Sequence, residues 1–323
     1  MLGYPTMDDI RQARKRLEPH IRHTPLLRAE AMEKAVGCQL YLKPETLQIT
    51  GAFKIRGALN KALSLSREAI VSGMIASSSG NHAQGLSYAA RMLGVKVILV
   101  LPVTTPKTKI ANTRALGAEV ILFDGDTAAR WQKVSEIAEG NNYAVIHGFE
   151  DPLVMAGQGT IGCEILEDLD DVDTVIVPIG GGGLISGIAT AIKELKPSVR
   201  VIGAEPSLTP KYFYSRANRE RTSFPLGNTI ADGLRISVPG QNPFPIIEKY
   251  VDEIVLVEDK HIIAGMRALA KDAKLIAEPA ASIGIGALLA GSVTVRPDEK
   301  VCAVLTGGNW DLCDLGDIYR DAE

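Results

Sequence analysis

The sequence lacks any long hydrophobic segment. Its apolar runs stop well short of the roughly 20 residues that a membrane-spanning helix needs. Residues 1–18 carry early acidic side chains and lack the apolar core of a secretory signal. There is also no basic block, and the net charge of −3 argues against a nucleic-acid ligand. We therefore expect a cytoplasmic protein with a small-molecule partner, binding neither nucleic acid nor membrane.

Cysteine is scarce. The four cysteines, Cys38, Cys163, Cys302 and Cys313, form no CxxC pair and have no histidine at zinc-ligand spacing. Cys302 lies within the apolar run VCAVL, which predicts a buried small hydrophobic residue. This usage favours a reducing cytoplasm.

The 323 residues, 46% of them hydrophobic, are enough for an ample core and for two domains. Helix-length segments such as Asn81–Leu93 and Thr127–Ala138 separate apolar, β-branched runs. Continuous apolar runs indicate strands buried on both faces, and strand–helix alternation indicates parallel sheets. The predicted fold class is α/β. The predicted strands are QLYL, GMIASS, VKVILVLP, AEVILF, YAVI, TVIVPIG, VRVIGAE, EIVLV and VCAVLTGG.

An unbroken glycine run, Gly180–Gly183, separates a predicted strand from a predicted helix at Leu184–Leu195. Backbone N–H groups there can converge on an anion at a helix N-terminus, although a flexible turn is the plainer alternative. No register supplies the GxGxxG pattern of dinucleotide sites, and no Walker Lys-Ser/Thr follows. Glu205 stands about where a ribose-binding acid would lie, which keeps a nicotinamide-binding alternative open. A phosphate monoester fits the run better than ATP or NAD.

Lys54 follows Phe53 at the start of a predicted helix, behind the Thr50–Gly51 turn. A surface lysine would be ordinary, but apolar neighbours and a positive helix end favour the neutral, nucleophilic amine. A neutral lysine near a phosphate loop indicates a Schiff base with a phosphorylated aldehyde. Pyridoxal phosphate is the obvious candidate.

These residues belong to a series of motifs spread over residues 24–311. In this order, the series resembles fold-type II pyridoxal-phosphate enzymes, specifically the threonine/serine dehydratase and serine racemase group. No single motif is as specific as the combination. The motifs are TGAFKIRGA, SSSGNHAQG, AGQGTIGCEI, VPIGGGGLISG, AEP, IADGL, EPAAS and LTGGNWD.

The resemblance implies a role for each matched residue. Lys54 is implied to bond the cofactor and then to act as the base, while Asn81 touches the phenolic oxygen of the cofactor. Thr306 is implied to place a hydroxyl beside the pyridine nitrogen, which makes the ring a weaker electron sink than a carboxylate would and favours elimination. The implied cofactor-binding residues are Phe53, Lys54, Asn81, Gly180, Gly181, Gly182, Gly183, Leu184, Gly233 and Thr306. The implied substrate-carboxylate loop comprises Ser79, Gly80, Asn81 and His82.

Ser79 is compatible with two reactions. In racemases of this group the matching serine protonates the substrate carbon opposite the lysine, so racemisation stands beside dehydration as an alternative. The plainer interpretation makes Ser79 the N-cap of the helix at Asn81–Leu93. Arg130 is a second candidate carboxylate partner, although a solvated helix arginine is at least as good an interpretation.

The chain departs from the family pattern at three places. Ala52 replaces the usual serine before Phe-Lys, and Phe149 replaces a polar residue of the racemases, which favours the dehydratases. Glu205 and the Thr209 carbonyl match part of the racemases' divalent-cation site, but Lys211 stands where an acidic ligand is expected. We therefore expect no requirement for a divalent metal.

The resemblance implies two domains with parallel-rich twisted sheets. The large, pyridoxal-phosphate-binding domain comprises residues 1–72 and 149–323, and a small domain at 73–148 carries the substrate loop. We expect a homodimer without the C-terminal regulatory domain of biosynthetic threonine dehydratases. The expected reaction is α,β-elimination on an L-β-hydroxy amino acid, giving a 2-oxo acid and ammonia. The substrate alternatives are threonine, serine, 3-hydroxyaspartate and aryl-serines. A serine racemase, a bifunctional enzyme, an NAD-binding oxidoreductase and a non-catalytic carrier remain rival functions.

Overall fold

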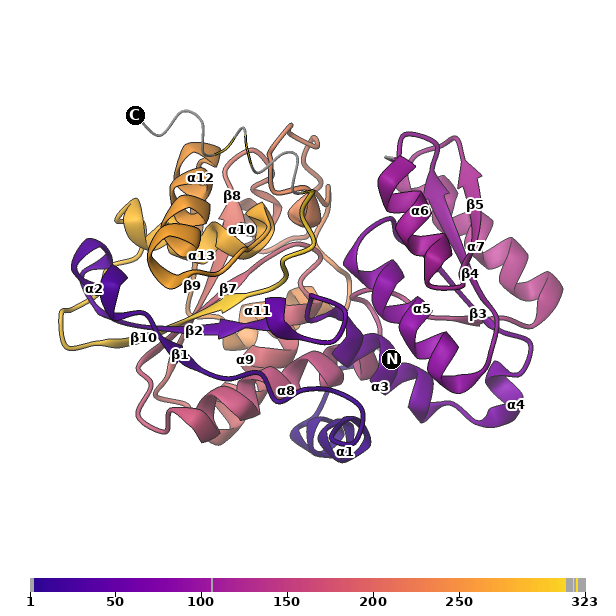
Figure 1. Ribbon diagram of the computed structural model, residues 1–323, viewed down its shortest axis with the longest axis horizontal. Coiled ribbons are helices and arrows are strands. Elements are labelled where there is room, and N and C mark those ends of the chain that lie inside the picture. Colours follow the sequence, from indigo (N-terminus) through magenta and orange to yellow (C-terminus); the bar gives the residue numbers. More distant parts are fainter. Residues whose placement is uncertain (1–2, 106, 312–315, 317, 319–323) are drawn as a thin grey trace.

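The computed structural model describes residues 3–105, 107–311, 316 and 318, and two parallel-rich sheets organise them. Figure 1 shows the two sheets in separate halves of the molecule, with α3 (Lys54–Ser64) where the halves meet. The larger sheet has the order β1-β2-β10-β7-β8-β9, and only β1 is antiparallel to its neighbour. Its strands are β1 (Leu27–Arg28), β2 (Gln39–Pro44), β7 (Thr174–Pro178), β8 (Arg200–Pro206), β9 (Glu253–Val257) and β10 (Lys300–Leu305).

The smaller sheet is wholly parallel, in the order β5-β4-β3-β6. All its strands lie between residues 73 and 148, the range predicted for the small domain; the exact domain boundaries stay a prediction. Its strands are β3 (Met74–Ser77), β4 (Val97–Pro102), β5 (Glu119–Phe123) and β6 (Ala144–Val145).

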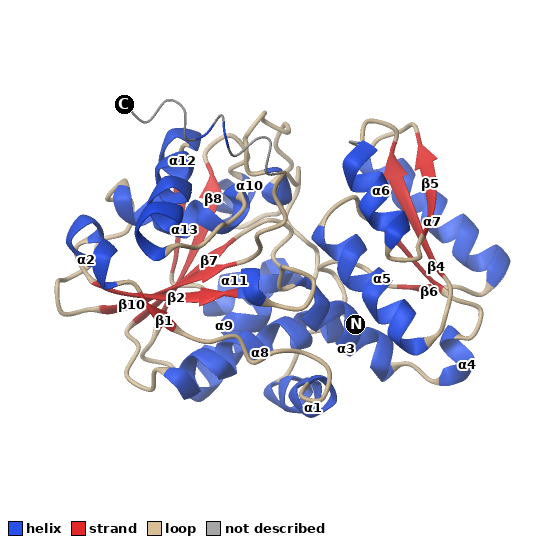
Figure 2. Ribbon diagram, in the orientation of Figure 1, coloured by secondary structure: helices blue, strands red, loops and turns tan. Residues whose placement is uncertain are grey.

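Helices cover both faces of each sheet, as parallel strands require (Figure 2). On β7, Ile176 packs with the cluster on the α13 side, whereas Val175 packs with the cluster on the α9 side. The other helices are α1 (Met7–Leu17), α2 (Glu30–Val36), α4 (Arg67–Ile70), α5 (Asn81–Leu93), α6 (Lys107–Ala115), α7 (Thr127–Asn141), α8 (Pro152–Asp168), α9 (Gly183–Leu195), α10 (Lys211–Asn218), α11 (Pro243–Tyr250), α12 (Asp259–Ala268) and α13 (Pro279–Leu289).

The structure confirms the α/β fold class and all nine predicted strands. It adds β1, whose two residues are too few to form an apolar run. Burial on both faces holds for β7 but not for β5, which lies at a sheet edge and is partly exposed. Cys302 is buried as predicted, and Cys313 lies outside the described residues. In the described part of the chain, no helix is long and apolar enough to cross a membrane.

Candidate active site

Two motifs about 250 residues apart in the chain are paired through their backbones next to Lys54. Ala52 and Gly307 form an isolated β-bridge. The N–H of Phe53 donates to the Thr306 carbonyl at 3.0 Å, and α3 begins at the next residue, Lys54. The turn that carries Lys54 is thereby fixed to the loop after β10. This contact places Thr306, the predicted ring-nitrogen partner, close to the predicted nucleophile.

The Lys54 amine lies in a largely dry environment. Its Nζ donates a hydrogen bond to the Gly148 carbonyl at 2.9 Å and lies 5.0 Å from the centre of the Phe53 ring. Desolvation lowers the pKa of Lys54 to about 8, against a smaller opposing effect of the Glu278 carboxylate. At neutral pH about a tenth of such amines are neutral, far more than for an ordinary lysine. Burial therefore favours the neutral amine, the direction that the sequence predicts, and the neutral form predominates above pH 8.

Two histidines, the buried His82 and the partly buried His147, lie within the electrostatic influence of the Lys54 amine. His82 Nε2 contacts the Ile146 carbonyl at 2.9 Å, while His147 stacks on Trp131 with ring centres 4.1 Å apart. Burial, with a smaller effect of the Lys54 charge, lowers the pKa of His82 to about 4. Burial likewise lowers the pKa of His147 to about 3. Both rings are neutral at physiological pH, so they add no competing positive charge near Lys54.

The predicted carboxylate loop connects β3 to α5. Gly80, not Ser79, is the N-cap residue of α5, and no side chain caps the helix. The interpretation of Ser79 as an N-cap is therefore wrong. Since the first N–H groups of a helix have no intrahelical partner, this uncapped end can accept a carboxylate. The His82 ring instead contacts the backbone carbonyl of Ile146. If His82 binds the substrate carboxylate, it therefore does so through its own backbone N–H.

Glu278 is a site residue that the sequence interpretation missed. Asn81 Nδ2 donates to Glu278 Oε1 at 2.8 Å, and Asn309 Nδ2 donates to Asn81 Oδ1 at 2.8 Å. The motif EPAAS, which contains Glu278, contributes to the family resemblance, but nothing in the sequence gave this carboxylate a role. Its signal was an acidic residue directly before the apolar segment that forms α13.

The glycine run forms a cradle that fits a phosphate. A Cβ added at Gly181 would lie 2.4 Å from the Phe149 ring, and Gly182 adopts a φ of +94°. No side chain caps α9, so its first N–H groups, including that of Leu184, are open to an anion. The run is therefore closely packed rather than a flexible turn.

Tyr212 supports the far side of the cradle. Its hydroxyl donates to the Gly181 carbonyl at 2.8 Å and accepts from the Gly240 N–H at 2.9 Å. Gly233 approaches from another loop, and its carbonyl would lie 3.1 Å from a Cβ at Gly180. Three separate segments thus hold the glycine run in place.

Glu205 and Lys211 form a fully buried ion pair at 2.8 Å. The same carboxylate also accepts the backbone N–H groups of Tyr212 and Phe213. Since its oxygens are occupied, Glu205 is not available to a ribose hydroxyl, which removes the basis of the nicotinamide alternative. The Thr209 carbonyl accepts the Lys211 N–H at 2.9 Å. Among the described residues, no group of three His, Cys, Asp or Glu side chains could hold a metal.

Arg130 lies on α7, which packs against the smaller sheet, and the hydrogen bonds of its side chain are local. Its guanidinium donates to the Gly125 carbonyl and to the Thr127 hydroxyl, both at 3.0 Å. Neither contact brings it to the Ser79–His82 loop. Of the predicted site residues, the structure therefore gives Arg130 the least support.

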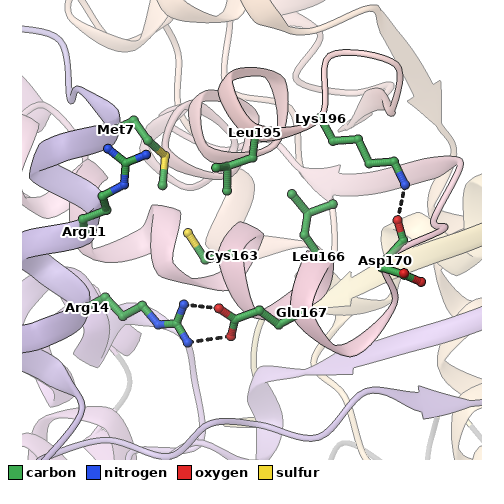
Figure 3. Close-up of a pocket in the computed structure, with 9 residues that line it drawn as sticks. All are labelled: Met7, Arg11, Arg14, Cys163, Leu166, Glu167, Asp170, Leu195 and Lys196. Carbon is green, nitrogen blue, oxygen red and sulfur yellow. Dashed lines mark hydrogen bonds and ion pairs between the residues drawn. The ribbon is translucent and has the colours of Figure 1, made fainter.

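A hollow of about 410 Å³ lies between α1, α8 and α9 (Figure 3). Arg14 already pairs with Glu167 there, and Lys196 reaches the Asp170 carbonyl. None of the predicted site residues lines it. It is separate from the site at Lys54.

Known proteins of one family resemble this chain in sequence and in fold. The family model described as "Pyridoxal-phosphate dependent enzyme" matches residues 17–307. An L-threonine ammonia-lyase from Geobacter sulfurreducens is 45% identical over 94% of this chain and 75% of its own length. A catabolic L-threonine dehydratase from Staphylococcus aureus (strain USA300) is 40% identical over 98% and 92%. The solved structure of maize serine racemase superposes with a TM-score of 0.93 at 34% identity, covering 98% of this chain and 97% of its own.

The match extends over most of the chain and includes Lys54, the glycine run and Thr306. It confirms the family that the motifs resemble. The chain belongs to the fold-type II pyridoxal-phosphate-dependent enzymes.

Proposed function

We propose that this enzyme is a lyase that converts an L-β-hydroxy amino acid of the threonine or serine type to a 2-oxo acid and ammonia. The observation that carries the proposal is the Lys54 amine, held by the Gly148 carbonyl next to the Thr306 loop. The relatives named as L-threonine ammonia-lyase and dehydratase support the substrate class.

The proposed chemistry divides between the cofactor and the chain. Bound pyridoxal phosphate supplies an electron sink that acidifies the α-proton of an amino acid. The N-terminus of α9 would hold its phosphate, and the N-terminus of α5 would hold the substrate carboxylate. Lys54, whose pKa of about 8 leaves a reactive neutral fraction, takes the α-proton. The β-hydroxyl then takes up a proton and leaves as water, and hydrolysis of the dehydrated amino acid gives the 2-oxo acid and ammonia.

The direct test supplies the purified enzyme with L-threonine, L-serine, threo-3-hydroxyaspartate and an aryl-serine in turn. We expect stoichiometric 2-oxo acid and ammonia from L-threonine or L-serine. A protein that shows the visible band of the cofactor but releases ammonia from none of the four would contradict the proposal and support a carrier.

Racemisation is the second candidate because Ser79 retains its hydroxyl on the loop before α5 and a serine racemase has the same fold. The variant Ser79→Ala separates the two reactions. If the enzyme also racemises serine, Ser79→Ala loses D-serine formation while ammonia release from L-serine persists. Chiral chromatography of the reaction mixture measures both.

We further propose that residues 73–148 move as a small domain that closes over the substrate and excludes water. The smaller sheet and the loop at Ser79 lie within this range. Hydrogen exchange should then slow in residues 77–82 when substrate binds. Unchanged exchange in this segment at saturating substrate would count against closure.

We also propose that the enzyme is a homodimer and that it is located in the cytoplasm. The buried free thiols of Cys38, Cys163 and Cys302 are consistent with a reducing compartment. The dimer is an expectation from the family resemblance. Sedimentation of the holoenzyme tests it, and a single species with the mass of one chain would disprove it.

A further inference from the structure

The side-chain amide of Asn81 is held on both sides. Its Nδ2 donates to Glu278 Oε1 at 2.8 Å, and its Oδ1 accepts from Asn309 Nδ2 at 2.8 Å. Asn81 begins α5 beside the smaller sheet, whereas Glu278 precedes α13 and Asn309 follows β10 beside the larger sheet. The three side chains therefore join the two halves of the molecule.

The chemistry of the partners fixes which way the amide points. A carboxylate only accepts hydrogen bonds, so the nitrogen of Asn81 must face Glu278. Asn309 is oriented in turn, because its Nδ2 also donates to the Thr50 carbonyl at 2.9 Å. A backbone carbonyl has no donor to offer in return. Rotating the Asn81 amide by half a turn would oppose oxygen to oxygen and nitrogen to nitrogen.

This amide lies directly against the turn that carries Lys54. A Cβ added at Gly307 would lie 3.2 Å from Asn81 Nδ2, 3.0 Å from Glu278 Oε1 and 2.9 Å from the Ala52 Cβ. The absence of a side chain at Gly307 is therefore what allows these groups to meet. Ala52 is two residues before Lys54, and the negative charge of Glu278 also raises the pKa of Lys54.

We propose that Glu278 and Asn309 are positioning residues that orient the Asn81 amide. They engage its oxygen and one N–H, and so present the second N–H, rather than the oxygen, to the phenolic oxygen of the cofactor. The inference rests on the proposed function and on the family resemblance, which implies that the phenolic oxygen of pyridoxal phosphate lies beside Asn81. A donor at that point stabilises a negatively charged oxygen, whereas an amide oxygen would repel it.

The test exchanges the donor at residue 309 and the acceptor at residue 278, the two side chains that hold the Asn81 amide. Asn309→Asp can donate neither to Asn81 nor to Thr50, so the Asn81 oxygen faces a carboxylate in either orientation and the amide is no longer held in one of them. The double variant Asn309→Asp with Glu278→Gln supplies a new donor to the turned oxygen. Apo-protein is titrated with pyridoxal phosphate, and we record the dissociation constant, the visible absorption maximum and the thermal midpoint of the apo-protein. Asn112→Asp, on the exposed surface of α6, is the matched control.

We expect Asn309→Asp to weaken cofactor binding by about tenfold or more, to move the absorption maximum, and to lower the thermal midpoint. The double variant should recover the thermal midpoint but not the affinity or the spectrum, because Gln at 278 and Asp at 309 together hold the amide in the turned orientation. A merely structural role predicts that affinity recovers together with stability, which would overturn the inference. Parent-like affinity in Asn309→Asp would also overturn it. A parent protein that takes up no pyridoxal phosphate would instead overturn the proposed function itself.

Discussion

The Lys54 amine donates a 2.9 Å hydrogen bond to the carbonyl of Gly148, 94 residues later in the chain. Gly148 lies between β6 of the smaller sheet and α8 beside the larger sheet. Its neighbour Phe149 packs against the glycine run, since a Cβ at Gly183 would lie 2.8 Å from the Phe149 Cα. One short segment therefore contacts both the predicted nucleophile and the predicted phosphate cradle.

Replacement of Lys54 tests the centre of the site. Lys54→Ala should bind pyridoxal phosphate without the visible band of the covalent form and should release no ammonia, because the amine that bonds the aldehyde and takes the proton is absent. Absorbance after gel filtration and an ammonia assay measure the two effects. Lys34→Ala, on the exposed surface of α2, should behave as the parent. Substantial turnover by Lys54→Ala would rule out this role.

The rate of cofactor capture should depend on pH through Lys54. Only the neutral amine attacks an aldehyde, and the pKa of Lys54 is about 8. Below that pH the rate should fall by about tenfold per unit, and above it the rate should level off. Glu278→Gln removes a charge that raises this pKa, so its plateau should begin at lower pH. Stopped-flow absorbance of the apo-protein measures both profiles, and identical profiles would contradict the assignment.

Acid should destabilise the apo-protein through His82. Burial lowers the pKa of His82 from 6.5 to about 4, so the unfolded state binds the proton first as pH falls. The stabilisation is complete above pH 6.5 and is lost as the pH drops toward 4. It amounts to about 3 kcal/mol of unfolding free energy. Urea unfolding across this range should show a shallower slope for His82→Gln, while His20→Gln, outside the site, should keep the parent slope.

The buried pair of Lys211 and Glu205 predicts that the parent enzyme is indifferent to divalent cations. Lys211→Ala leaves an uncompensated buried carboxylate and should cost about 3–5 kcal/mol of stability. Magnesium should raise the thermal midpoint of this variant and leave that of the parent unchanged. Lys193→Ala, which breaks a more exposed pair with Asp252, should cost under about 1 kcal/mol. Loss of parent activity with a chelator, restored by magnesium, would refute metal independence.

The phosphate cradle should be sensitive to one added methyl group. Gly181→Ala places a Cβ 2.4 Å from the Phe149 ring, so one of the two segments must move and cofactor affinity should fall by about tenfold or more. Adding Phe149→Ala removes the obstacle and should recover part of the affinity. Gly140→Ala on α7 meets nothing within 4 Å and should leave binding unchanged. Equal affinity for Gly181→Ala and the parent would contradict this account of the cradle.

The sequence by itself determined the fold class, the strands and the residue types of the site. Continuous apolar runs separated by helix-length segments favour the strands of parallel sheets, and α5 has the bounds that apolar spacing predicted. Lys54, the glycine run and Thr306 were also apparent, because each lies in a local motif that follows a turn or a strand.

Only the tertiary structure decided how these motifs meet. The bonds from Asn81 to Glu278 and Asn309 join residues about 200 positions apart, and no local pattern encodes a contact of that kind. Local propensity also indicated the wrong cap residue for α5: serine suits an N-cap, yet Gly80 takes that position. Periodicity and propensity act over a few residues, whereas the orientation of a side chain depends on the distant groups that its fold brings within hydrogen-bonding distance.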